Sequence, residues 1–438
     1  MDFNQKAYSQ ALEHIFALSP SVQSAGFASG AYKPGLEGMQ RFDTALGHPW
    51  RKYRCIHVAG TNGKGSVSSI IASALAQGAR RVGLYTSPHI SDFRERMRVV
   101  TGAGWYMPTE REVWDFLQEY DAAMKGLSFF EITTGMAFWW FARQKVDIAV
   151  VEVGLGGRLD STNIITPELC IITSIGLDHC AMLGGTRAAI AGEKAGIFKP
   201  GVPAVVASED EETAPVFLRA AIAAGCPLIF ADSVPGSALE RHILSKMDLR
   251  GPCQEQNLHT SAVALAVLSG SGQNTARAFD KALTFSKSAI LHTAQRSGFR
   301  GRWERLQESP EVICDIGHNP PALKINFGRL EALGRPLWIV YGVMRDKDLA
   351  GIAPLMPSAA HYILVAPDTP RALPEAELEK QLRELRPELN VQGAGSVAEG
   401  ISKALENASA APGEPLVYIG GSTFVVTEAV DYYKHHRS

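Results

Sequence analysis

The sequence has no long hydrophobic run, no excess of charge of one sign and no closely spaced pair of cysteines. Its apolar stretches end well before the roughly 18 residues that span a bilayer, so we expect no membrane association. The 43 Lys and Arg residues balance 45 Asp and Glu residues, for a formal net charge of −2, so no overall field attracts nucleic acid. Any phosphate group must therefore be bound by a local set of residues, and not by the overall charge of the protein.

The six cysteines are scattered without CxxC spacing, and most stand in apolar, strand-like contexts. Residues 1–16 have the pattern of an amphipathic helix and lack the basic segment and apolar core of a secretion signal. We therefore expect reduced cysteines and a cytoplasmic protein. The 438 residues, 46% of them hydrophobic, suffice for two or three separately cored domains.

Short segments rich in Val and Ile alternate with segments of helical period, which is typical of parallel α/β folds. Strands are predicted at 55–59, 82–86, 147–153, 169–175 and 203–207, and in a second series at 312–316, 337–341, 362–366 and 416–419. Thr109 and Glu112 have the spacing of a helix capping box. The pattern lapses over 232–256, and two helices, 257–269 and 274–288, follow. We expect domains at 1–291 and 302–438 with 292–301 as a linker.

The strongest chemical signal is the glycine-rich segment at 60–66, which follows a predicted strand and precedes a helical segment. It reads Gly60, Thr61, Asn62, Gly63, Lys64, Gly65, Ser66. Glycines in this position let backbone amides converge on phosphate oxygens, and Lys64 would add a positive charge. Ser66 stands where a phosphate-binding loop approaches Mg²⁺. The alternative is a turn selected only for packing, which leaves the lysine and the serine without a role.

Glu152 ends the apolar strand 147–153 and is followed by Gly154-Leu-Gly-Gly-Arg-Leu-Asp160. A carboxylate at the carboxyl end of a parallel strand faces the ligand crevice and can hold Mg²⁺. A buried glutamate paired with arginine is the structural alternative. The segment after it could also begin a dinucleotide-binding fingerprint, although Leu159 stands where that fingerprint has its third glycine.

Two further positions lie beyond the fourth predicted strand. His179 could complete a metal site, but a lone histidine is more often structural. Lys194, in the segment Gly192-Glu-Lys-Ala-Gly196, is by position alone a surface charge.

In the second series, Arg302 precedes a strand that ends in Asp315, and His318 and Asn319 follow. The prolines at 320 and 321 favour a helix start that leaves the polar residues before it at the crevice. This pattern indicates a nucleotide-contacting set of Arg302, Asp315 and His318. As an alternative, Asp315 and Asn319 are only helix caps.

Eight segments together resemble the folylpolyglutamate synthase and dihydrofolate synthase family of the Mur ligase superfamily. In chain order they are HVAGTNGKGS, GLYTSPHISDFRERMRV, FFEITTGMAF, VVEVGLGGRLDSTN, TSIGLDHCAMLGG, GEKAGIFK, GRWE and DIGHNP. The resemblance covers nearly the whole chain. It implies an α/β protein with a P-loop N-terminal domain, whose sheet is mostly parallel, and a smaller Rossmann-like C-terminal domain.

The resemblance also implies site residues. ATP would be bound by Gly60, Thr61, Asn62, Gly63, Lys64, Gly65, Ser66, Asn257, Arg302, Asp315 and His318, with Lys64, Lys194 and His318 as catalytic residues. Two Mg²⁺ ions would be held by Ser66, Ser87, Glu152, His179 and Lys194, the last as a carbamate formed with CO₂. Pteroate or folate would contact Ser128, Phe129, Phe130, Glu131, Leu159, Asp160 and Ser161, where Ser161 replaces the alanine usual in the family.

The implied activity is ATP-dependent ligation of L-glutamate, through an acyl phosphate, to dihydropteroate and to the γ-carboxylate of reduced folates. The alternative within the family is a folylpolyglutamate synthase without the first activity. We expect small-molecule substrates only, no nucleic acid or membrane partner, and a monomer. Outside the family, a nicotinamide-dependent dehydrogenase and a nucleotide-binding regulatory protein are the alternatives.

Overall fold

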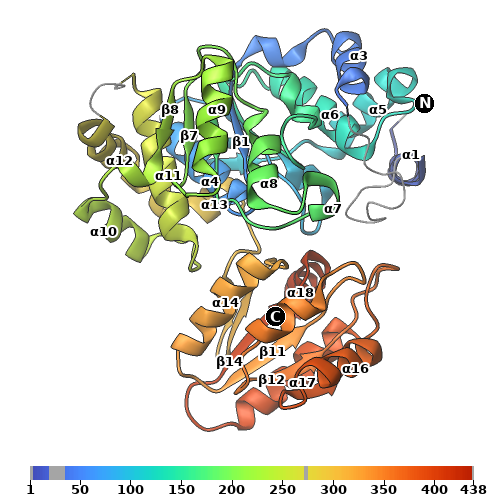
Figure 1. Cartoon of the computed structure of the whole chain (residues 1–438). Coiled ribbons are helices and arrows are strands. Elements are labelled where there is room, and N and C mark those ends of the chain that lie inside the picture. The colour runs from blue at the N-terminus through green and yellow to red at the C-terminus, as the bar shows by residue number, and fades with distance from the viewer. Residues whose placement is uncertain (1–2, 19–34, 271–274, 437–438) are drawn as a thin grey trace. The chain divides into compact units, whose positions relative to one another are not determined.

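The computed structural model describes residues 3–18, 35–270 and 275–436, which form two compact α/β units (Figure 1). The first unit ends at Phe299 and the second continues from Arg300, with 90–92 and 249–253 also belonging to the second. The strands of the first unit are β1 (Arg54–Ala59), β2 (Val82–Tyr85), β3 (Met97–Thr101), β4 (Gly104–Tyr106), β5 (Ile148–Glu152), β6 (Leu169–Ile172), β7 (Ala204–Val206) and β8 (Leu228–Phe230).

These strands form one sheet in the order β4-β3-β2-β5-β1-β6-β7-β8. The six strands from β2 to β8 are parallel, and β3 and β4 extend one edge antiparallel. The described helices of this unit are α1 (Gln5–Leu18), α3 (Glu37–Ala45), α4 (Lys64–Leu75), α5 (Glu110–Met124), α6 (Phe129–Arg143), α7 (Cys180–Leu183), α8 (Arg187–Ala195), α9 (Ala214–Ala224), α10 (Ala238–Lys246), α11 (Gln254–Leu268), α12 (Thr275–Leu291) and α13 (Thr293–Ser297).

Helices cover both faces of this sheet, as the alternation of side chains along β1 shows. Cys55 joins the apolar core under α5 and α6, and Ala59 joins the core under α8 and α9. Ile56 and Val58 are fully buried and point to the opposite face, where α4 and α11 pack. Burial on both faces explains why the central strands read as continuous apolar runs.

The second unit has a six-stranded sheet in the order β13-β12-β11-β14-β10-β9, parallel except for the edge strand β9. Its strands are β9 (Glu304–Glu308), β10 (Glu311–Cys314), β11 (Leu337–Tyr341), β12 (His361–Leu364), β13 (Asn390–Gly393) and β14 (Leu416–Gly420). Its helices are α14 (Pro320–Ala332), α15 (Leu349–Ile352), α16 (Glu375–Leu385), α17 (Val397–Ala410) and α18 (Thr423–His436). Helices α14 and α16 share one apolar core with this sheet, and helices α17 and α18 share the core on its other face.

The predicted strands all occur within one to three residues of their expected ends, and the capping box of Thr109 and Glu112 is confirmed at the start of α5. Two segments contain helices that the sequence pattern did not predict. The segment 232–256 contains α10, which begins with a capping box of Ser237 and Glu240. The segment 292–301, expected to be a linker, contains α13, whose residues Thr293 and Ser297 are buried. No described helix is long and apolar enough to cross a membrane.

Candidate functional site

The loop at 60–66 joins β1, in the middle of the sheet, to the N-terminus of α4. Gly63 caps this 12-residue helix with a φ of 88°. Among the described residues, no protein acceptor receives a hydrogen bond from the backbone amides of residues 63–66. The first amides of a helix have no partner within the helix, and the helix dipole adds partial positive charge there. These amides are therefore available to bind an anion.

Each glycine of this loop is required by a neighbour that leaves no room for a Cβ. A Cβ on Gly60 would overlap Thr173 Oγ1, and one on Gly63 would overlap Asn257 Oδ1. A Cβ on Gly65 would lie 2.7 Å from the Phe299 ring. Asn257, expected at the nucleotide on the basis of resemblance, thus lies against the loop.

The segment after β6 supports the loop from the other side. Thr173 Oγ1 and Ser174 Oγ donate to the carbonyl oxygen of Asn62 at 2.7 and 3.1 Å, and Thr61 N donates to the carbonyl of Ser174 at 2.7 Å. This role of Thr173 and Ser174 was not predicted from the sequence. Their place at the carboxyl end of a predicted strand beside the loop was the available signal.

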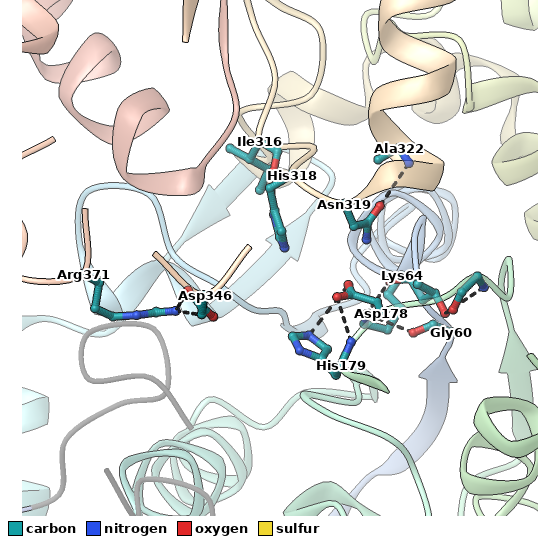
Figure 2. Close-up of polar contacts among 12 residues, drawn as sticks. Gly60, Lys64, Asp178, His179, Ile316, His318, Asn319, Ala322, Asp346 and Arg371 are labelled. Carbon is teal, nitrogen blue, oxygen red and sulfur yellow. Dashed lines mark hydrogen bonds and ion pairs between the residues drawn. The ribbon is translucent and has the colours of Figure 1, made fainter. Parts of the chain in front are cut away.

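The Lys64 side chain folds back over the loop (Figure 2). Its Nζ donates to the carbonyl oxygens of Gly60 and Thr61 at 3.0 and 3.1 Å. A bound phosphate would compete with these carbonyls for the ammonium group. Lys64 therefore lies close to the loop amides, where its ammonium group can contact an anion that these amides bind.

Glu152 ends β5 beside the first turn of α4 and is 2% exposed. Ser87 N donates to its Oε2 at 3.3 Å, and the same oxygen would lie 3.4 Å from a Cβ on Gly65. The charge of Glu152 also counteracts the lowering of the pKa of Arg96 that burial causes. Its surroundings thus include both the phosphate loop and a buried arginine, and they fit both of the interpretations drawn from the sequence.

Lys194 is 4% exposed, so its interpretation as a surface charge is wrong. Burial and, to a lesser extent, the nearby charge of Lys64 lower its pKa to about 7. The carboxylates of Asp178 and Asp160 oppose this shift. A substantial fraction of the Lys194 amine is therefore uncharged near neutral pH, and the uncharged amine is a nucleophile.

The loop 154–160 packs against its neighbours. A Cβ on Gly154 would lie 2.5 Å from the Phe130 ring, and one on Gly157 would lie 2.7 Å from the carbonyl oxygen of Glu193 in α8. The loop leads into the 3₁₀ turn η4 (Ser161–Ile164). A dinucleotide-binding loop opens a full helix, so the structure does not support that alternative.

Asp160 is buried and holds this loop together. Its carboxylate accepts from the amides of Leu155 and Thr162 at 2.8 and 3.0 Å. Burial raises its pKa, and the hydrogen bonds from Thr162 and Leu155 counteract the shift. Ser161 beside it is 7% exposed and Leu159 is half-buried.

The segment 128–131 begins α6 as a capping box. Glu131 Oε2 accepts from Ser128 N and Ser128 Oγ, and Ser128 Oγ accepts from Glu131 N. Phe129 is buried beneath the guanidinium of Arg96, 5.3 Å from its ring centroid. Two of the four residues of this segment that are expected to contact pteroate therefore have a structural role as a helix cap.

His179 precedes α7 with a φ of 52°, and its Nε2 lies 3.8 Å from Asp178 Oδ2 (Figure 2). Within the part of the chain that is described, no group of three or more His, Cys, Asp or Glu residues is arranged to hold a metal ion. The expected ligand set contains only two such residues, Glu152 and His179. A site here would need the hydroxyls of Ser66 and Ser87 and a modified Lys194.

In the second unit, Asp315 follows β10 and is 7% exposed. Its carboxylate accepts from Trp303 N at 2.9 Å, Gly317 N at 2.7 Å and Asn326 Nδ2 at 2.9 Å, so it is not a helix cap.

Asn319 is the cap of α14, and its side chain accepts from Ala322 N at 3.0 Å. His318 Nδ1 donates to the carbonyl of Ile316 at 3.0 Å (Figure 2). Arg302 donates to the carbonyl of Gly301 at 3.2 Å. The cap interpretation is therefore right for Asn319 and wrong for Asp315.

Comparison with known proteins identifies two family domains. The Mur ligase middle domain matches residues 58–245, and the domain described as "Mur ligase, glutamate ligase domain" matches residues 301–422. The chain is 34% identical to the folylpolyglutamate synthase of Lacticaseibacillus casei over 76% of this chain and 82% of that protein. It is 33% identical to the dihydrofolate synthase/folylpolyglutamate synthase of Escherichia coli, over 87% of each.

Solved structures show the same fold. E. coli FolC in complex with DHPP and ADP superposes with a TM-score of 0.77 and 28% identity over 98% of each chain. A bifunctional folylpolyglutamate synthase/dihydrofolate synthase with Mn, AMPPNP and L-glutamate bound has a TM-score of 0.75 and 25% identity over 97% of each. The chain belongs to the folylpolyglutamate synthase and dihydrofolate synthase family of the Mur ligases and is an ATP-dependent, amide-bond-forming ligase.

Proposed function

We propose that the protein joins L-glutamate both to dihydropteroate and to the γ-carboxylate of reduced folates, using ATP. The observation that carries this proposal is the set of backbone amides at 63–66, which stands beside Lys64 and Glu152 and has no protein acceptor among the described residues. The relatives named above supply the class of substrate: one is a folylpolyglutamate synthase, and the other carries both names.

The chemistry requires activation of a carboxylate, which is a poor electrophile at neutral pH. The carboxylate oxygen attacks the γ-phosphorus of ATP, the bond to the β–γ bridging oxygen breaks, and an acyl phosphate and ADP result. The α-amino group of glutamate then attacks the acyl carbon and loses a proton. Phosphate leaves and the amide remains. Phosphoryl transfer depends on positioning and charge neutralisation, which the loop amides and Lys64 provide.

ATP would be held by the loop 60–66 and Asn257 in the first unit, and by Arg302, Asp315 and His318 in the second. The contact between Asn257 and Gly63 supports this assignment in the first unit. In the second unit the assignment rests on the family resemblance. Lys64, Lys194 and His318 are the proposed catalytic residues.

Two Mg²⁺ ions would be held by Ser66, Ser87, Glu152, His179 and Lys194 carboxylated by CO₂. Bound Mg²⁺ supplies charge neutralisation to the phosphates. The buried carboxylate of Glu152 beside the first turn of α4 fits a hard cation, and the solved bifunctional relative has Mn bound. A neutral Lys194 amine can add to CO₂ with loss of a proton, which gives an anionic carbamate whose oxygens could bind Mg²⁺.

The pteroate group would contact the segments 128–131 and 159–161. The Phe130 ring lies against Gly154, at the start of the loop that carries the second segment, which brings the two regions together. Because Ser128 and Glu131 cap α6, their side chains would act by fixing this helix start.

The test is ADP release from Mg-ATP and L-glutamate with dihydropteroate or tetrahydrofolate as the acceptor, and without glutamate as the control. Turnover with both acceptors is expected. Turnover with tetrahydrofolate alone would reduce the assignment to tail extension, and turnover with neither would refute it. Light scattering on the eluted enzyme tests the proposal that it is a monomer.

A further inference from the structure

Phe299, the last residue of the first unit, touches the phosphate loop, and the function described so far gives it no role. A Cβ on Gly65 would lie 2.7 and 2.8 Å from its Cζ and Cε2 atoms, and 3.4 Å from Glu152 Oε2. The ring edge of Phe299 and the carboxylate of Glu152 therefore both lie close to Gly65, in the first turn of α4 between Lys64 and Ser66.

The chain before Phe299 is firmly attached to the β3–β4 hairpin. The guanidinium of Arg98, which is 4% exposed, donates to the carbonyl of Ser297 at 2.9 Å. Arg296 donates to the carbonyls of Ala76 and Gly102 at 2.8 and 3.2 Å. These bonds tie α13 to β3, to the β3–β4 turn and to Ala76 at the C-terminal end of α4, so the chain directly before Phe299 is anchored.

The chain after Phe299 is attached to the second unit just as closely. The carbonyl oxygen of Gly301 accepts from Ile316 N at 3.0 Å, and its amide donates to Glu304 Oε2 at 2.8 Å. Gly301 has a φ of 72°. Only Arg300 separates this anchored glycine from Phe299. The connection between Phe299 and this anchored glycine is thus one residue long.

We propose that Phe299 is a positioning residue of the ligase: its ring holds the Gly65–Ser66 turn in the geometry that binds phosphate and links that geometry to the segment joining the two units. This inference rests on the proposed function, because it assumes that the loop binds ATP. The ring would touch neither ATP nor the reacting carboxylate. It acts through the backbone of Gly65.

A substitution series separates this role from general stability. Phe299→Ala is expected to weaken the binding of Mg-ADP and to lower kcat/KM for ATP by about tenfold each, since a 1.4 kcal/mol loss of positioning corresponds to that factor. KM for glutamate should change less than twofold. Phe299→Leu keeps an apolar contact and should recover most of the loss. Phe285→Ala removes a 69% exposed ring on α12 and is the matched control.

The decisive experiment is a rescue. Gly65 has no positive φ, so alanine is tolerated by its backbone, and the Phe299 ring is the neighbour that the new methyl group would meet too closely. Gly65→Ala should therefore lose Mg-ADP binding, and the double variant G65A/F299A should bind at least tenfold better than G65A.

A double variant no better than G65A, or an F299A variant that binds and turns over like the wild type, would overturn the inference. Melting temperatures of all variants verify that each one folds. If the wild type itself neither binds Mg-ADP nor ligates glutamate, it is the proposed function that fails, and the two failures are thus distinguished.

Discussion

Two glycine-rich loops follow neighbouring parallel strands of the same sheet, and they use their amides in opposite ways. After β1, the amides of residues 63–66 have no protein acceptor among the described residues. After β5, the amide of Leu155 bonds to the Asp160 carboxylate and that of Arg158 to the carbonyl of Glu193. Glycine content is similar in both loops, so it does not distinguish a phosphate loop from a packing loop.

The second loop contains its own anion. Asp160 accepts from amides on both sides of it in the chain, as an external phosphate would accept from the amides of the first loop. Consequently, Lys64 of the first loop should matter mainly for function, and Asp160 of the second loop should matter mainly for stability. Each prediction below tests one side of this contrast.

The largest effect is expected for Lys64→Ala. Removal of the ammonium takes away the only side-chain charge within the loop 60–66. We expect the ligation rate to fall about a thousandfold or more, because charge stabilisation in phosphoryl transfer is typically worth that much. Stability should change little, since Lys64 is only half-buried and its partners are loop carbonyls.

Steady-state ADP release and a thermal melt of the same preparation measure both quantities. Lys145→Ala, an exposed lysine between α6 and β5, serves as the control. Wild-type turnover in the Lys64→Ala variant would refute the phosphate loop, and a large drop in melting temperature would remove the contrast between the loops.

The next effect is expected for Asp160→Ala, which leaves the buried amides of Leu155 and Thr162 without acceptors. We expect a loss of about 3 kcal/mol in the free energy of unfolding, from the cost of buried unpaired groups. Asp160→Asn keeps one acceptor oxygen and should lose about half as much. Urea unfolding measures both variants, and equal stability of the alanine variant and the wild type would show that the carboxylate does not hold the loop.

The contrast between the loops also shows how far the sequence could be interpreted. Strands β1, β5 and β11 are buried on both faces, and such strands appear as apolar runs that are easy to locate. The edge strands β4, β8 and β9 are short or mix exposed and buried residues, so their pattern resembles loops. Helix α10 was missed because the surrounding polar and Pro/Gly-containing sequence obscured its period.

The site divides in the same way. The loop 60–66 was predictable because its motif is local, with a strand before it and a helix after it. The burial of Lys194 was not predictable from its position, because α8 buries it through tertiary packing. Phe299 was missed because its role depends on a contact with the distant Gly65, and no local pattern encodes such a contact.

The third prediction concerns Lys194, which lies beneath the second loop. Its folded pKa of about 7 is below its unfolded value of 10.5, so folding releases a proton between these two pH values. Stability from this group should therefore rise with pH across that window. Lys194→Met removes the cost of burying the amine and should stabilise the protein by about 2 kcal/mol at pH 7.5, while abolishing ligation.

Urea unfolding of wild type and Lys194→Met at pH 6.5, 8 and 10.5, in buffers freed of CO₂, measures this difference. The gain should be largest at pH 6.5 and should vanish near pH 10.5. A gain that does not depend on pH would mean that packing, and not the proton, accounts for it.

The smallest effect is expected at His259, which fastens α11, the helix that holds Asn257 against the first loop. Its two ring nitrogens lie 2.9 Å from Glu240 Oε1 and 2.9 Å from the carbonyl oxygen of Ala231. Both partners accept, so the imidazolium fits best, and the hydrogen bond to Glu240 raises the pKa of His259 while burial counteracts the shift. The stabilisation should be complete below pH 6.5 and should be lost as the pH rises through the raised value.

His259→Gln should therefore cost about 1 kcal/mol at pH 6, after allowance for solvent screening, and less at pH 9. His242→Gln, an exposed histidine on α10, is the control for the change of residue type. Because the neighbours of Gly60 and Gly65, which are Thr173 and Phe299, lie outside α11, Mg-ADP affinity should stay within twofold of the wild type. A parallel loss of affinity would show instead that the amides of the first loop depend on the anchoring of α11. The two loops would then differ also in what fixes them, because Asp160 within the second loop accepts from its amides.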